Sequence, residues 1–356
     1  MNYRPNPLLN RRSLLKLAAL AGGSAGLATL LSSRLSYSAD QNQASAKNIE
    51  AIEEFLRQIR PVDSQNLQWT EYSFETVTVD RRGQIIDRRQ GSARSWREPL
   101  GNGSELEMVA IPGGSFRRGS KNEERGDHTS SEKPENSVTT AAFFLSKYPI
   151  TQAQWRAIAQ LDKINLELNP APSFFQGDNL PVERVSWYEA IEFCQRLSRS
   201  TGKDYRLASE SRWEYACRAG TTTPFYCGET LTSERANYFA VYDPYAEEPA
   251  SAYLARTTPV GSFAPNNFGL YDMHGNVGEW CADSWHRNYE GNPPLDGSAW
   301  LDRDTRLQPR YRSARLVRGG SWGDEARHLR SANRTFCLPD QHHSVLGLRV
   351  MADSTG

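Results

Sequence analysis

The absence of any long helical pattern after Gly220 constrains the fold more than any other feature of the chain. From there to the C-terminus, short apolar and aromatic runs alternate with Gly, Pro and Asn, which is typical of short strands and loops. Nine Trp, fifteen Tyr and thirteen Phe, in a chain with only 38% hydrophobic residues, indicate a core of aromatic rings beneath many loops. We therefore expect an irregular α+β fold with few short helices and strands.

Three helices are expected upstream of that region, each with a recognisable N-terminal cap. Thr151 with Gln154 and Ser186 with Glu189 form capping boxes, and Ser209 caps the third helix. Each cap precedes apolar residues at helical spacing. The sequence therefore predicts where these helices begin.

The region before the main domain predicts smaller elements. Residues 49–59 have the apolar spacing of a short amphipathic helix. Residues 68–79 are rich in aromatic and β-branched types, and Arg81–Gly83 turns them towards 84–87, which predicts a β-hairpin. Residues 106–116 read as a strand that stops at a Pro-Gly-Gly turn. We expect an extension over 40–105, made of linker, helix and hairpin, before a main domain over 106–356.

The first 39 residues read as an export signal. Asn10–Lys16 resembles the twin-arginine motif, and a weakly apolar, Gly- and Ala-rich run follows over 14–31. The alternative is an uncleaved N-terminal membrane helix, since the run is about long enough to span a bilayer. Cleavage is expected near Ser38 or Ala39. The mature protein is expected in the periplasm or a lumen, with membrane attachment only if the signal stays uncleaved.

The charge balance excludes one class of partner. The signal carries five basic residues and no acid, so the remainder has 37 basic and 42 acidic residues. A mature chain of that slightly negative charge has no electrostatic footprint for nucleic acid.

Several longer sequence motifs, in order along the chain, resemble the formylglycine-generating enzyme, or sulfatase-modifying factor, family. These motifs, which we term the family motifs, are Pro149–Gln152, Leu180–Trp187, Tyr205–Ala216, Thr258–Phe263, Gly269–Trp280, Arg318–Trp322 and Leu346–Val350. The resemblance covers about residues 106–351. It implies an irregular C-type-lectin-like fold, in agreement with the pattern of short elements.

The resemblance also implies chemistry that this chain lacks. The family's enzymes hold copper through a pair of cysteine thiolates, the soft ligand that cuprous copper prefers. The pair would follow Arg318–Trp322, where this chain reads Gly323–His328 without a cysteine. Cys337 is the only nearby thiol. We therefore expect neither copper nor formylglycine-generating activity, although a cysteine-independent maturation factor remains the alternative. Its candidate catalytic residues, chosen only by position, are Ser321, Trp322, Asp324 and His328.

Two disulfides of vertebrate-type members are not expected either. By resemblance, the partners of Cys194 and Cys217 would stand at Val350 and Ser331. Both cysteines lie in helical patterns and are expected as buried, small apolar groups.

The family also carries calcium, and the resemblance transfers one site. Its ligands would be the Asp272 side chain, the Gly275 and Val277 carbonyls and the Glu279 carboxylate. Hard oxygen ligands from one tight turn suit a hard cation. The alternative is that the two acids cap the turn and meet solvent. The six histidines show no HxxxH or HExxH spacing, so a His-ligated metal centre is not expected.

Between the last two family motifs lie two short runs that mix apolar and polar residues, Thr335–Leu338 and His342–Val345. This layout is similar to the variable proteins of diversity-generating retroelements, which use the same lectin-like scaffold. Exposed aromatic and polar residues on loops of a rigid scaffold form a binding face, so we expect an exported, non-catalytic module that binds a protein or peptide ligand. The alternative is that Phe336 and Leu338 pack inward as ordinary core. The candidate binding residues are Thr335, Phe336, Cys337, Leu338, His342, His343, Ser344 and Val345.

Overall fold

The computed structural model describes residues 52, 54–57, 60–127, 129–241 and 244–355. The predicted export signal lies outside these residues. Leu56–Gly356 forms one compact unit. In the predicted helix at 49–59, the described residues at 52 and 54–57 are helical. Within the described part of the chain, no helix has the length and apolar character needed to cross a membrane.

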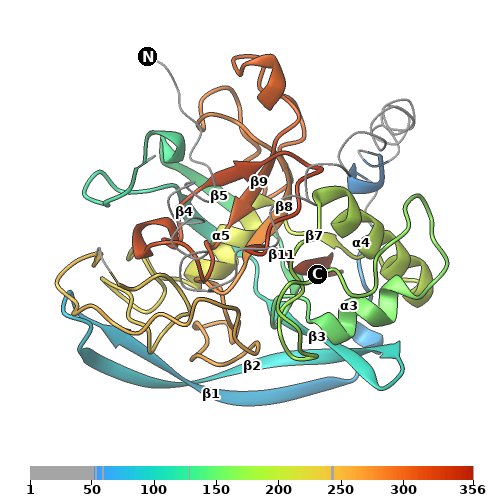
Figure 1. The fold of residues 1–356 in the computed structure, drawn as a ribbon, viewed down its shortest axis with the longest axis horizontal. Helices are drawn as coiled ribbons and strands as arrows, with labels where there is room; N and C mark the ends of the chain where they lie inside the picture. Colours follow the sequence, from blue (N-terminus) through green and yellow to red (C-terminus); the bar gives the residue numbers. More distant parts are fainter. Residues whose placement is uncertain (1–51, 53, 58–59, 128, 242–243, 356) are drawn as a thin grey trace, which may run out of the picture. The chain divides into compact units, whose positions relative to one another are not determined.

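This unit contains a six-stranded sheet, whose first two strands run along the lower edge of the molecule in Figure 1. Its neighbouring strands are antiparallel. In spatial order the strands are β1 (Trp69–Val79), β2 (Ile85–Gly101), β3 (Ser104–Ile111), β6 (Phe143–Ser146), β12 (Val350–Asp353) and β7 (Arg206–Leu207).

The predicted hairpin is present and longer than its sequence pattern indicated. β2 continues to Gly101 and pairs with β3, so the predicted extension and the main domain share one sheet. The continuation has a physical cause, because Trp96 and Leu100 are 2% and 8% exposed on this otherwise polar strand. The predicted boundary between residues 105 and 106 falls inside β3.

Two smaller sheets hold the rest of the strands. One contains β10 (Thr335–Cys337), β9 (Arg315–Arg318), β8 (Gly278–Ser284) and β11 (Leu346–Leu348), in that order. Every residue of β8 is buried, and β11 is its parallel neighbour. The other pairs β4 (Gly114–Arg118) with β5 (Asn136–Thr140). Two of the family motifs, Gly269–Trp280 and Leu346–Val350, therefore meet on adjacent buried strands.

The three predicted helices begin at their predicted caps. They are α3 (Gln152–Ala159), α4 (Trp187–Thr201) and α5 (Glu210–Arg218). Thr151 and Ser186 form complete capping boxes, and the Ser209 hydroxyl accepts from the Arg212 N–H. Beyond α5, the helical segments of the described residues are short 3₁₀ turns alone, at Pro309–Tyr311 and Ala326–His328. An earlier pair of 3₁₀ turns spans Ser64–Asn66 and Thr129–Glu132.

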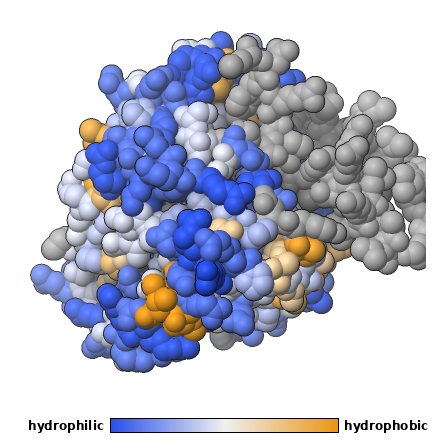
Figure 2. Space-filling model, turned by 90° about the vertical axis from the view of Figure 1, so that its left-hand side faces the viewer, coloured by the Kyte–Doolittle hydropathy of each residue, from blue (hydrophilic) through white to orange (hydrophobic). Residues whose placement is uncertain are grey.

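The core is aromatic, as the composition predicted. Trp155, Trp187, Trp213 and Trp280 are each at most 1% exposed. By contrast, the face in Figure 2 is mostly hydrophilic, and its hydrophobic residues form small separate groups. The α+β architecture with short elements agrees with the fold class expected from the sequence.

Candidate functional site

Trp322 is fixed in the turn that follows β9. Its backbone N–H donates to the Asn276 carbonyl at 3.0 Å, and its indole Nε1 donates to the Ser344 carbonyl at 2.9 Å. Only 4% of the residue is exposed. Two hydrogen bonds to separate segments therefore set both the position and the orientation of the indole.

Aromatic rings from two distant loops surround Trp322. The Phe175 ring meets it edge-on at 5.5 Å, and the Tyr253 ring lies nearly parallel to it at 6.4 Å, both measured between ring centroids. Phe239 packs edge-on against Tyr253 at 4.7 Å, and Phe174 against Phe175 at 5.0 Å. These five residues form what we term the aromatic cluster. Three chain segments thus contribute to a single apolar surface.

The aromatic cluster reaches solvent at one side. Phe174 is 65% exposed and Leu254, next to Tyr253, is 52% exposed. Arg256 lies over the Phe175 ring, with its guanidinium carbon 5.7 Å from the ring centroid. Phe174 thus offers a large apolar side chain at the edge of the cluster, where another molecule can contact it.

A buried carboxylate holds the Phe174–Phe175 segment in place. Glu183 Oε1 accepts the backbone N–H groups of Phe174 at 2.5 Å and Phe175 at 2.9 Å. The Ser173 hydroxyl accepts the Glu183 N–H at 3.1 Å. Burial raises the pKa of Glu183 to about 7, against the lowering effect of these backbone hydrogen bonds. The loop bearing two of the aromatic rings is therefore anchored by one acid.

The candidate catalytic residues lie in and after the same turn. The Ser321 hydroxyl donates to Asp324 Oδ2 at 2.7 Å, and the Asp324 carbonyl accepts the Phe239 N–H at 2.8 Å. Burial raises the pKa of Asp324. Burial lowers the pKa of His328, whose Nε2 lies 3.5 Å from Asp127 Oδ2. Ser321 and Asp324 thus support the wall of the aromatic cluster.

Four of the eight candidate binding residues face the protein interior. The Phe336 ring lies 4.8 Å from that of Trp285 and packs on the main core, as does Leu338. Cys337 and Val345 are 7% and 1% exposed. Phe336 and Leu338 therefore pack on the core while staying half-buried, and their role in binding stays a prediction.

The other four residues keep some accessible surface, as do the half-buried Phe336 and Leu338. Thr335, His343 and Ser344 are half-buried, and His342 is exposed. His342 Nε2 lies 2.7 Å from Glu189 Oε2 on α4, and this contact raises the pKa of His342. Because the Ser344 carbonyl holds the Trp322 indole, this run borders the aromatic cluster.

In the predicted calcium turn, one carboxylate oxygen of Asp272 has no hydrogen-bond partner in the described part of the chain. Asp272 Oδ2 accepts the Gly261 N–H at 2.7 Å, while the buried Oδ1 has no hydrogen-bond partner. Burial raises the pKa of Asp272 to about 6. Asp272 and Gly275 both have positive φ, at 55° and 81°, as the predicted tight turn requires. An orphaned buried carboxylate oxygen fits a cation ligand.

Glu279, the other predicted acidic ligand, does not fit. Its carboxylate accepts from Arg349 Nη2 at 3.0 Å and from the Trp213 indole at 2.6 Å, and the residue is 1% exposed. A cation there would displace a guanidinium. Among the described residues, no cluster of three or more His, Cys, Asp or Glu could hold a metal ion. Calcium therefore stays a prediction, with Asp272 as its best-placed ligand.

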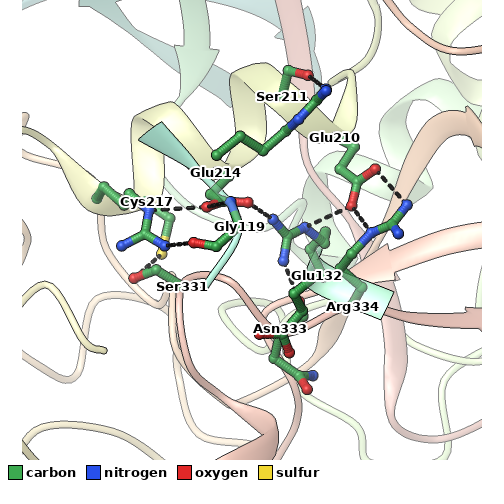
Figure 3. Close-up of polar contacts among 12 residues, drawn as sticks. Gly119, Glu132, Glu210, Ser211, Glu214, Cys217, Ser331, Asn333 and Arg334 are labelled. Atoms are coloured by element: carbon green, nitrogen blue, oxygen red, sulfur yellow. Dashed lines mark hydrogen bonds and ion pairs between the residues drawn. The ribbon is translucent and has the colours of Figure 1, made fainter. Parts of the chain in front are cut away.

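All five cysteines are free and buried. Cys217 Sγ lies 3.6 Å from the hydroxyl of Ser331 (Figure 3), the position at which the resemblance placed a disulfide partner. Burial raises the pKa of Cys217 and of Cys337 to about 12. A buried, protonated thiol is a poor nucleophile and a poor metal ligand.

A network of buried charges ties the region to α5 (Figure 3). Glu210 accepts from Arg334 Nη2 at 2.9 Å, and Glu214 pairs with Arg318 and accepts from Arg218 Nε at 2.9 Å. Neither carboxylate is more than 2% exposed. Arg318 and Arg334 stand at either end of the segment that contains Trp322, so α5 holds both ends of it.

The aromatic cluster was not predicted from the sequence. Its other four rings lie between the family motifs, and no local pattern links them to Trp322; they belong to Phe174, Phe175, Phe239 and Tyr253. Their one shared signal is aromatic character within polar loops.

Comparison with known proteins places these observations. The model of the sulfatase-modifying factor enzyme 1-like domain matches residues 97–354. The formylglycine-generating enzyme of Thermomonospora curvata is 28% identical over 298 residues, covering 69% of this chain and 93% of that protein. The structure of PvdO from Pseudomonas aeruginosa has 34% identity and a TM-score of 0.59, covering 72% of this chain and 97% of that one.

A further relative is much longer than the matched region. The serine/threonine-protein kinase Pkn1 of Chlamydia trachomatis is 29% identical over 265 residues, which is 69% of this chain. The chain spans 38% of the length of that kinase.

Proposed function

Because the chain belongs to the sulfatase-modifying factor enzyme 1-like family, we propose that it uses this scaffold to bind a protein or peptide ligand, without the family's thiol chemistry. The observation that carries the proposal is the convergence of aromatic rings from two distant loops on Trp322, with Phe174 exposed at their edge. Aromatic side chains give large contact areas at low entropic cost, which suits a binding surface.

The thiols support a non-catalytic role. The turn Gly323–His328 contains no cysteine, and Cys337 lies buried in β10. A copper centre of the family's kind needs two accessible thiolates. Ser321 and Asp324 bond to each other, which fits support of the turn.

We also propose that the mature chain acts outside the cytoplasmic membrane, in the periplasm or a lumen. The support is the twin-arginine motif around Arg11 and Arg12. Cell fractionation is expected to find wild-type protein in the exported fraction, and the Arg11→Lys, Arg12→Lys double variant retained inside. Equal export of both proteins would remove the twin-arginine route.

Peptide selection tests the binding role. Peptides selected from a displayed library on the purified domain are expected to bind Phe174→Ser at least about tenfold more weakly than wild type. Leu295→Ser is the matched control, because Leu295 is also exposed, at 53%, on another loop. Equal losses in both variants, or no loss in Phe174→Ser, would contradict binding at the aromatic cluster.

An activity assay tests the alternative. A peptide containing Cys-x-Pro-x-Arg, incubated with copper and the domain, is expected to keep its thiol. Conversion of the cysteine to formylglycine would establish an oxidase and refute the non-catalytic proposal.

A further inference from the structure

The β1–β2 hairpin adds to the family domain and ends its sheet. The family match begins at residue 97, so β1 and most of β2 precede it. Both strands continue the six-stranded sheet, and β1 is its outermost strand (Figure 1). The outer edge of such a strand presents backbone groups with which another strand can pair.

The hydrogen bonds of Val79 identify which groups point outward. Its N–H donates to the Cys227 carbonyl at 2.7 Å, and its carbonyl accepts the Glu229 N–H at 3.3 Å. The register shift between Thr78 and Val79 skips Ile86 on β2, so the alternation of backbone direction along β1 continues. Glu71, Ser73 and every second residue up to Val77 therefore present their groups to the same edge as Val79. Across the described part of the chain, no strand or bridge pairs with this stretch.

The end of this edge already accepts a strand-like segment. Gly228 forms a parallel bridge with Val79. A Cβ on Gly228 would lie 2.2 Å from the Val79 carbonyl oxygen, so only glycine permits this approach. The chain itself thus demonstrates strand addition to β1, and leaves the rest of the edge open.

The side chains along the open edge define the partner. Glu71, Ser73 and Glu75 are exposed on one face, while Tyr72 and Phe74 pack on the other, where Gly269 approaches them. An added strand would place alternate side chains beside the two glutamates. On β2, Arg88 pairs with Glu75 and Arg94 lies directly opposite Glu71, while the side chain of Glu75 stays 43% exposed.

We propose that the β1 edge binds an extended segment of another protein in which basic residues alternate with apolar ones. Basic side chains would lie beside Glu71 and Glu75, and apolar ones would lie beside Tyr72 and Phe74 on the other face. A second copy of this chain fits poorly. Antiparallel registers of two copies centred between residues 71 and 75 would place their glutamates directly or diagonally opposite, which is unfavourable.

A charge-swap experiment tests this proposal. The probe is a seven-residue peptide of alternating lysine and valine, compared with one of alternating glutamate and valine. Fluorescence anisotropy is expected to give at least about tenfold tighter binding of the lysine peptide, and the reverse order for the Glu71→Lys, Glu75→Lys variant. Glu167→Lys, at a glutamate 76% exposed elsewhere, is the matched control and should keep the wild-type preference.

Hydrogen exchange locates the binding. The lysine peptide is expected to protect the amides of Glu71, Ser73, Glu75 and Val77. A lysine peptide with N-methylated alternate amides, which cannot form the ladder, should bind weakly. Absence of binding, equal binding of both charges, or protection elsewhere would overturn the proposal. So would an unchanged preference in the double lysine variant.

Discussion

Replacing Ser331 by cysteine is expected to create a disulfide with Cys217 and to stabilise the fold. The Ser331 hydroxyl already lies 3.6 Å from Cys217 Sγ, in a buried and fixed environment. The two residues are 114 positions apart. For a loop of that length, restriction of the unfolded chain gives an upper limit of about 5 kcal/mol, and native strain typically reduces the measured gain to about 2–4 kcal/mol.

The assay is urea unfolding of Ser331→Cys with and without reductant, together with titration of free thiols. The oxidised variant should lose two thiols and unfold at higher urea than its reduced form. Ser331→Cys in a Cys217→Ala background is the matched control, and its stability should not respond to reductant. Five free thiols plus the new one after oxidation, or no reductant-sensitive gain, would refute the inference that the two positions are placed for a bond.

Three further predictions follow from buried carboxylates. Because burial raises the pKa of Glu183 from 4.5 to about 7, the folded state binds this proton more tightly than the unfolded state. The free energy of unfolding of wild type should therefore increase by about 3 kcal/mol from pH 8 to pH 4.5, relative to that of Glu183→Gln. Parallel profiles of unfolding free energy against pH would contradict this. Glu210→Gln should leave Arg334 without its charge partner and cost about 3–5 kcal/mol in urea unfolding, whereas Glu234→Gln, at a glutamate 81% exposed, should cost under about 0.5 kcal/mol; equal costs would refute the role of the network. Calcium at about a hundred times its Kd should raise the unfolding free energy of wild type by about 2.7 kcal/mol and leave Asp272→Ala unchanged, and a calcium-insensitive wild type would remove the site.

Local signals predicted the helices because a cap depends on residues three positions apart. All the hydrogen bonds of a capping box are made between two nearby residues, and the structure forms both boxes, Thr151 with Gln154 and Ser186 with Glu189. The hairpin turn is equally local. The end of β2 was not predicted, because its continuation depends on burial of Trp96 beneath other elements.

The candidate site required information that no local pattern holds. The direction of Phe336 is set by Trp285 and Tyr311, and the pairing of Glu279 by Arg349, which lies 70 positions away. The aromatic cluster likewise joins segments that are distant in sequence. Residue type indicated aromatic binding chemistry, but the fold decided which rings face solvent.

The anchoring of both ends of one segment to α5 has a practical consequence. Arg318 and Arg334 hold the segment between them to Glu214 and Glu210, independently of the residues in its turn. The two ends of the segment are therefore fixed, while side chains between them can change. We expect that the half-buried Glu325 and Arg327 can be replaced while both arginines keep their partners, with Asp324 and the buried Ala326 retained. That would make this domain a scaffold for engineered recognition.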